Sequence, residues 1–183
     1  KALEADPGAG AAGPLAYDGD GRLQAMGLPY RLVQARALRA ARGPGGSAAA
    51  VRAPWLAGFL VVATRLALTA TGGYDEGFRF TNEDLDHGLR AARLGYASLL
   101  VATKAVHLGG SSTPRHPAFH VEGRRGGFVV TARHYPRAVR SLHRAYLVLE
   151  GTLGSAVAPS APARAAHAAV ARMARQGRWD RPP

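Results

Sequence analysis

Residues 83–102 read EDLDHGLRAARLGYASLLVA and decide the fold class, because a helical pattern is followed at once by a strand pattern. The first part, residues 83–94, carries apolar side chains at helical spacing and predicts a helix that Gly95 ends. The second part, residues 96–102, is an apolar run broken by a single serine and predicts a buried strand. The predicted apolar face of the helix comprises Leu85, Leu89 and Ala92. A helix that leads directly into a strand is typical of α/β proteins.

The flanking segments continue this alternation of helices and strands. The two glycines at 72–73 are expected to end a short helix over residues 65–70. In chain order, the other predicted elements are a β-hairpin or exposed loop (5–30), a linker (42–50), a buried strand or buried helix (55–63), a strand (128–132) and a basic amphipathic helix (137–149). The predicted fold is therefore α/β, with a mixed sheet flanked by helices.

The composition is strongly basic. The chain of 183 residues has a formal net charge of +12, and of its 24 basic residues only Lys1 and Lys104 are lysines. The arginines are scattered instead of forming one run with interleaved aromatic residues, so we do not expect nucleic acid as a partner. The chain has no cysteine, which excludes disulfides and cysteine-based metal sites.

The acidic residues are concentrated in one short segment of this basic chain. Five of the twelve lie between positions 75 and 86: Asp75, Glu76, Glu83, Asp84 and Asp86. The last three fall in the first turn of the predicted helix, where backbone N–H groups are unpaired and the helix dipole favours negative charge. Thr81, three residues before Asp84, suggests a capping box. Stabilisation of the helix is therefore one sufficient explanation for these acids.

The same acids are candidates for catalysis. Glu83 and Asp84 point about 100° apart on a helix, so one can face a cleft while its neighbour stabilises the backbone. A carboxylate held at the start of a helix beside a cleft can act as a general base. Asp86 and Arg90 are spaced i, i+4, which predicts an ion pair whose role is either structural or functional.

Several spaced motifs occur in order between residues 55 and 112. They are WLAG (55–58), Arg65, GGYDEGF (72–78), EDLD (83–86), Arg90, GY (95–96) and VHLGGSS (106–112). This series resembles the signature of family 2 glycosyltransferases of the GT-A fold, a family that includes rhamnosyltransferases. Tyr74 replaces a common phenylalanine, and His87 stands where leucine is frequent. The resemblance extends over residues 4–150.

The resemblance implies transfer of a sugar from a nucleotide-sugar donor to an acceptor hydroxyl with inversion, in cell-wall or polysaccharide biosynthesis. The acceptor would be a carbohydrate, a lipid-linked molecule or a protein. The resemblance implies that Asp84 is the general base, that Glu83 holds the acceptor and that Asp86 braces the site. The implied substrate-binding residues are Trp55, Gly58, Asp75 and Arg90. Trp55 could stack on a sugar face, although a packing role is equally open.

The resemblance also implies a divalent cation, Mg²⁺ or Mn²⁺, against the donor diphosphate. His107 follows a strand and would lie beside this metal or the diphosphate; a structural histidine is the alternative. The family's Asp-x-Asp motif is expected upstream of this chain, since Asp18-Gly19-Asp20 reads as a turn. The glycines at 109–110 could let a loop close over the nucleotide. Three arginines either neutralise the diphosphate or are solvated surface residues: Arg115, Arg124 and Arg125.

We expect residues 1–150 to form the acceptor-side part of a GT-A domain and residues 151–183 to be a tail that is partly helical or disordered. A donor-binding half of on the order of 100 residues is expected before Lys1, so this portion is expected to be inactive alone. No apolar run reaches the roughly 18 residues of a membrane span, so we expect a cytoplasmic protein, or one in peripheral contact with an anionic membrane. Two alternatives remain: a basic non-catalytic module that binds RNA or anionic lipid, and a structural partner of a split transferase.

Overall fold

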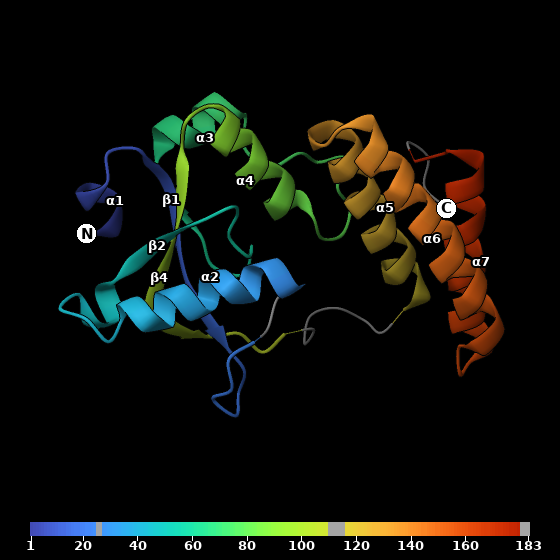
Figure 1. Cartoon of the computed structure of the whole chain (residues 1–183), viewed down its shortest axis with the longest axis horizontal. Coiled ribbons are helices and arrows are strands. Elements are labelled where there is room, and N and C mark those ends of the chain that lie inside the picture. The colour runs from blue at the N-terminus through green and yellow to red at the C-terminus, as the bar shows by residue number, and fades with distance from the viewer. Residues whose placement is uncertain (25–26, 110–115, 180–183) are drawn as a thin grey trace. The chain divides into compact units, whose positions relative to one another are not determined.

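The computed structural model describes residues 1–24, 27–109 and 116–179, which divide into two compact units (Figure 1). The first, called here the sheet unit, comprises Lys1–Asp75 and Asp84–Thr113. The second, called here the helical unit, comprises Glu76–Glu83 and Pro114–Pro183. Most of the predicted glycine loop, and Arg115, lie outside the described residues.

The sheet unit contains a four-stranded sheet in the order β2-β4-β1-β3. The two central strands, β1 (Ala9–Tyr17) and β4 (Ala97–Val106), are parallel. The outer strands, β2 (Ala50–Ala53) and β3 (Val62–Ala63), are antiparallel to their neighbours. The prediction of an α/β fold with a mixed sheet is therefore confirmed, as is the strand that follows Gly95.

Strand β1 corrects the prediction of a hairpin or loop over residues 5–30. Its sequence, AGAAGPLAY, is nearly all buried between β4 and β3. Only the turn after it matches the prediction, with an isolated bridge between Tyr17 and Leu23. Alanine and glycine have low strand propensity, and Pro14 is unusual in a central strand, so the sequence pattern missed it. The pairing of β1 with β4 shifts in register between Pro14 and Leu15.

The prediction of a continuous strand or helix over residues 55–63 is wrong. Only Val62–Ala63 pairs as a strand, and residues 54–61 are irregular. The strand on the other edge, Ala50–Ala53, begins at the last residue of the predicted linker. Leu56 is nevertheless buried in the core. The apolar character of this run reflects its contact with the core rather than its pairing in the sheet.

Four α-helices surround the sheet: α1 (Ala2–Ala5), α2 (Gly27–Ala40), α3 (Arg65–Thr71) and α4 (Glu83–Arg93). A 3-10 turn, η1, spans Gly46–Ala48. Helix α2 runs across the sheet in Figure 1, and its buried Tyr30 and Val33 belong to the same core cluster as Leu15 and Leu100. The predicted helices at 65–70 and 83–94 are both confirmed, and Gly72 ends α3 with φ 73°.

The buried face of α4 is not the predicted one. Leu85 and Leu89 are only half-buried and Ala92 is exposed. The residues that are buried instead are Asp86, His87, Gly88 and Ala91. The helix therefore turns charged and polar side chains inward, which needs specific partners inside the protein.

The helical unit contains α5 (Pro117–His134), α6 (Arg137–Val157) and α7 (Ala161–Gln176). The strand predicted over residues 128–132 is wrong, because Phe128 and Val130 are buried within α5. The predicted helix from Arg137 is confirmed and extends to Val157. Positions 150 and 151, where the sequence analysis divided the chain, both lie inside α6.

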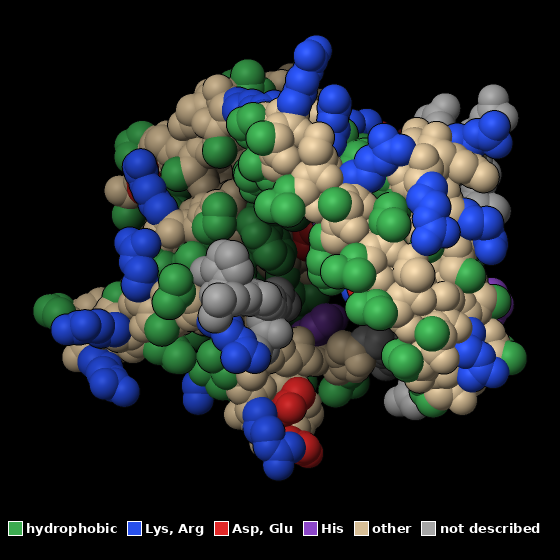
Figure 2. Space-filling model, turned by 45° about the vertical axis from the view of Figure 1, so that its right-hand side comes forward, with side chains coloured by type: hydrophobic (Ala, Val, Ile, Leu, Met, Phe, Trp, Pro, Cys, Tyr) green, Lys and Arg blue, Asp and Glu red, His purple; other side chains and the backbone are tan. Residues whose placement is uncertain are grey.

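Two surface properties bear on partners. Among the described helices, none combines the length and the apolar character that crossing a bilayer requires. Figure 2 shows Lys and Arg side chains spread over the visible surface instead of gathered in one patch. This distribution agrees with the scatter of arginines along the sequence.

Gly10 in β1 offers a test of the packing of the sheet. A Cβ atom at Gly10 would lie 2.7 Å from Cβ of Tyr96 and 2.8 Å from Cβ of Ala67. We expect Gly10→Ala to lower the free energy of unfolding by about 1–3 kcal/mol, measured by urea denaturation. Gly19→Ala is the matched control, since its nearest neighbour atom would be 3.5 Å away. Equal losses in the two variants would contradict the central position of β1.

Candidate functional site

Asp84 lies in the first turn of α4 and connects this helix to the irregular segment before β3. Its Oδ2 accepts a hydrogen bond of 2.9 Å from the backbone N–H of Gly58. Its Oδ1 accepts one of 2.7 Å from the N–H of Leu85. A carboxylate offers about four lone-pair positions, so these two bonds leave capacity on both oxygens. The structure thus brings together two of the predicted site residues, Asp84 and Gly58.

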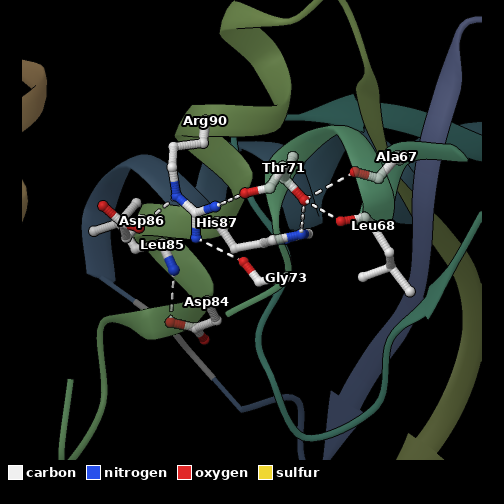
Figure 3. Close-up of polar contacts among 9 residues, drawn as sticks. All are labelled: Ala67, Leu68, Thr71, Gly73, Asp84, Leu85, Asp86, His87 and Arg90. Carbon is white, nitrogen blue, oxygen red and sulfur yellow. Dashed lines mark hydrogen bonds and ion pairs between the residues drawn. The ribbon is translucent and has the colours of Figure 1, made fainter. Parts of the chain in front are cut away.

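Asp86 and Arg90 form the ion pair that their spacing predicted (Figure 3). The Nε of Arg90 donates to Oδ2 of Asp86 at 2.7 Å, and the Asp86 side chain is completely buried. The remaining Arg90 nitrogens donate to the carbonyls of Thr71 and Gly73, where α3 ends. Arg90 therefore joins α4 to α3, and these contacts support the bracing role proposed for the pair.

His87 lies on the same buried face of α4 and contacts the same turn. Its Nε2 is 3.1 Å from Oγ1 of Thr71. The Thr71 hydroxyl donates its proton to the carbonyl of Ala67, so it accepts from Nε2–H of His87. Burial lowers the pKa of His87, the Arg90 charge lowers it further, and the Asp86 charge opposes both. His87 is therefore held as a neutral ring with its proton on Nε2.

Trp55 packs inside the sheet unit. Its ring lies 4.7 Å from that of Tyr30, and it contacts the core cluster of that unit. A Cβ atom at Gly88 would come within 2.7 Å of Cβ of Trp55, so α4 approaches this residue closely. Trp55 is only partly buried, so these packing contacts leave its role in substrate binding a prediction.

Tyr30 is a residue near the site that the sequence analysis missed. Burial raises the pKa of Tyr30 to about 12; the Asp84 charge adds to the increase, and a hydrogen bond with the Ala57 backbone opposes it. Tyr30 is therefore a protonated phenol close enough to Asp84 to feel its charge. The sequence analysis missed it because residues 5–30 were predicted as a hairpin or loop, whereas Tyr30 lies in helix α2.

Two further predicted residues are Asp75, in the connection between α3 and α4, and Glu83, the first residue of α4. Both side chains are half-buried. Before α4 the backbone has positive φ at two non-glycine residues, Thr81 (53°) and Asn82 (72°). The roles of Asp75 and Glu83 in substrate binding stay predictions.

His107 follows β4 at the edge of the sheet where β1 also ends. Its Nδ1 is 2.8 Å from Oε1 of Gln24, whose Nε2 donates to the His107 carbonyl at 2.6 Å. Its ring stacks on Phe59 with centroids 4.8 Å apart. Tyr17, the last residue of β1, pairs with Val106 directly before it. The carboxyl edge of parallel strands is where α/β proteins usually bind ligands.

The carboxylates at this edge do not fit a Mg²⁺ or Mn²⁺ site. Oδ1 of Asp18 accepts from the backbone N–H groups of Asp20 and Arg22 at 3.0 and 2.8 Å. Asp20 forms an ion pair with Arg22. Both acids therefore build the turn after β1, as the sequence predicted for Asp18-Gly19-Asp20.

Two of the arginines proposed near the diphosphate are engaged within the helical unit. Arg124 pairs with Glu150. Arg125 is 7% exposed, pairs with Glu122 at 2.8 Å and donates to the carbonyl of Gly77. Arg125 is therefore not the solvated surface residue that the sequence suggested as one alternative, whereas the Arg124 side chain is 40% exposed although it pairs with Glu150.

Part of the sequence is similar to a known glycosyltransferase, although no protein-family model matches the chain. The relative is N-acetylglucosaminyl-diphospho-decaprenol L-rhamnosyltransferase of Mycobacterium tuberculosis, found in strains CDC 1551 / Oshkosh and ATCC 25618 / H37Rv. The identity is 35% over 68 residues, which is 37% of this chain and 22% of each relative. The match thus spans about a fifth of the length of these relatives. It supports a relationship to glycosyltransferases at a coarse level.

The pair of Asp86 and Arg90 is expected to contribute strongly to stability. Arg90→Gln leaves the buried carboxylate without this cation, so we expect the free energy of unfolding to fall by about 3 kcal/mol. Asp86→Asn is expected to cost about 1–3 kcal/mol. A double-mutant cycle by urea denaturation should give a coupling energy of at least about 1 kcal/mol. Additive losses would contradict the bracing role.

The buried neutral form of His87 predicts a dependence of stability on pH. The pKa in the folded state is lowered from 6.5, so the unfolded state takes up a proton first as the pH falls. The free energy of unfolding is therefore retained above pH 6.5 and falls below it. The fall is at most about 1.4 kcal/mol per pH unit for the one proton that the unfolded His87 takes up. His87→Gln should reduce this slope between pH 7 and pH 5. Identical slopes in the two proteins would show that His87 is not held neutral.

Proposed function

We propose that this chain forms the acceptor-activating part of an inverting glycosyltransferase, with Asp84 as the general base. The observation that carries the proposal is the placement of Asp84. The carboxylate lies at the start of a helix and is oriented by the N–H groups of Gly58 and Leu85. A helix with a buried ion pair is a rigid support for such a group. The partial similarity to a rhamnosyltransferase supports glycosyl transfer as the reaction class.

The same partial similarity supports a proposal for the substrates. We propose a nucleotide-activated sugar as the donor and a hydroxyl of a lipid-linked saccharide as the acceptor. The name of the relative describes an acceptor of this kind, N-acetylglucosamine on a diphospho-decaprenol. The donor diphosphate and its metal are expected to depend on residues outside the described sites, because Asp18 and Asp20 are engaged in a turn.

The reaction step needs one base and one displacement. The acceptor hydroxyl gives its proton to a carboxylate oxygen of Asp84, and its oxygen attacks the anomeric carbon of the donor. The bond from that carbon to the diphosphate breaks, and the electron pair leaves on the diphosphate oxygen. Positioning of the base by the protein is expected to contribute about 10²–10⁴ in rate.

In this proposal Tyr30 and Arg90 do not contact the substrate but help to position Asp84. The protonated phenol of Tyr30 lies under the influence of the Asp84 charge and has no acidic role near pH 7. Arg90 holds α4 against the end of α3 and so sets where Asp84 stands. Both are positioning residues, whereas Asp84 alone would contact the reacting proton.

Asp84→Asn tests the assignment of the base. The full-length gene product is assayed for transfer from uridine, guanosine and thymidine diphosphate sugars to a polyprenyl-diphospho-N-acetylglucosamine. We expect the amide to lower kcat by a factor of about 10² or more while donor binding is retained. The amide has one acceptor oxygen for the two N–H groups of Gly58 and Leu85, so we expect a loss of about 1 kcal/mol in the free energy of unfolding, measured by urea denaturation.

The contrast with Asp86→Asn separates catalysis from folding. Asp86→Asn should lower stability and activity together, because Asp86 acts through Arg90. Asp84→Asn should lower activity far more than its small loss of stability explains. Turnover by Asp84→Asn within a factor of about three of the unsubstituted protein would exclude Asp84 as the base.

A further inference from the structure

Three side chains converge at one point of the helical unit, and each comes from a different helix. They are His120 on α5, Glu150 on α6 and His167 on α7, and one ligand atom of each lies within 4.8 Å of the others. Nε2 of His120 and Nδ1 of His167 are each 3.9 Å from Oε1 of Glu150. The two imidazole rings lie 4.3 Å apart at 59°. None of these contacts is short enough to be a hydrogen bond.

Each of the three side chains carries a buried atom without a hydrogen bond. Nε2 of His120, Nδ1 of His167 and Oε2 of Glu150 are three of the buried side-chain atoms without a partner in the described part of the chain. Each such atom costs about 1–3 kcal/mol. All three atoms belong to groups that bind metals, so one cation could satisfy them together.

The surroundings orient the three groups. Arg124 donates to Oε1 of Glu150 from Nη2 at 2.8 Å and from Nε at 3.2 Å, so Oε2 is the oxygen left for a ligand. Such outer hydrogen bonds are typical of metal-binding carboxylates. A Cβ atom at Gly154 would overlap the ring of His167, so this ring reaches the cluster only because residue 154 is glycine.

A cavity beside the cluster provides access from solvent. His116, Ser160 and Ala163 line it together with His120 and His167. Burial lowers the pKa of His120, and the neighbouring His167 and Arg124 charges lower it further, against the effect of Glu150. These effects favour the neutral ring, which is the form that binds a metal.

We propose that Nε2 of His120, Nδ1 of His167 and a carboxylate oxygen of Glu150 bind one divalent transition-metal ion, with Zn²⁺ as the first candidate. Two imidazoles and one carboxylate suit Zn²⁺ better than Mg²⁺ or Ca²⁺, which prefer oxygen ligands. Zn²⁺ lies about 2.0–2.2 Å from such ligands, which places ligand atoms of a tetrahedral site about 3.4 Å apart. The ligand atoms lie within 4.8 Å of one another, so the side chains must close by up to about 1.4 Å to bind the ion.

This site is separate from the acidic segment at Asp84. All three ligands come from helices of the helical unit. The ion would join α5, α6 and α7 at one point, so its binding is expected to raise the thermal stability of this unit.

Calorimetric titration of Zn²⁺ into the chelator-treated chain tests the proposal. We expect one ion per chain, with an affinity in the micromolar range because the Arg124 charge opposes a cation. His120→Ala and His167→Ala should each weaken binding by at least about tenfold. His143→Ala is the matched control: His143 is a half-buried histidine of the same unit whose Nδ1 contacts Thr131, and its loss should leave binding unchanged.

Gly154→Ala keeps all three ligands and is expected to weaken Zn²⁺ binding by displacing the ring of His167. Co²⁺ provides a readout on the unsubstituted chain: intense visible absorption bands indicate a four-coordinate site with nitrogen ligands. Circular dichroism checks that each variant keeps its helices. Absence of stoichiometric binding to the unsubstituted chain, or equal affinity in the His120→Ala/His167→Ala double variant, would overturn the proposal.

Discussion

The Asp86 carboxylate has no exposed surface, and the position of α4 depends on how its negative charge is compensated. A buried charge is tolerated only with a cation and hydrogen bonds around it. Arg90 supplies the cation from one turn later, and the same guanidinium reaches the carbonyls of Thr71 and Gly73. Those carbonyls would otherwise be unpaired groups near the end of a helix. One side chain thus satisfies the acid and joins two helices.

The rest of the candidate site follows from this orientation of α4. With Asp86 and His87 turned inward, Gly88 comes close to Trp55, where any larger residue would collide. The first turn of the helix then meets the segment before β3, and Asp84 accepts the N–H of Gly58. A carboxylate supported in this way has little freedom to move, which is what a general base requires.

The sequence predicted the elements with strong local signals. Helix α3 is preceded by a threonine and followed by two glycines, and α4 is followed by Gly95, so the sequence indicated where these helices end. The pairing of Asp86 with Arg90 followed from spacing alone. Strand β1 was missed because small residues and a proline carry no strand pattern, and its burial comes from neighbours distant in sequence.

Other features depend on tertiary contacts that no local pattern contains. The buried face of α4 is polar because Arg90 pairs with Asp86 and Thr71 contacts His87. The helix approaches Trp55 through Gly88, and its leucines stay half-exposed. Phe128 and Val130 suggested a strand but are buried by the other helices of their unit. The cluster of His120, Glu150 and His167 combines three helices, and the spacing of its members in the sequence follows no ligand motif.

The claim that Asp84 activates an acceptor for a single displacement has a direct stereochemical consequence. Proton NMR of the first-formed product of the full-length gene product gives the anomeric configuration of the new linkage. The account predicts the configuration opposite to that of the sugar in the donor. Retention of the donor configuration would contradict the single displacement, and with it the role of Asp84 as the general base.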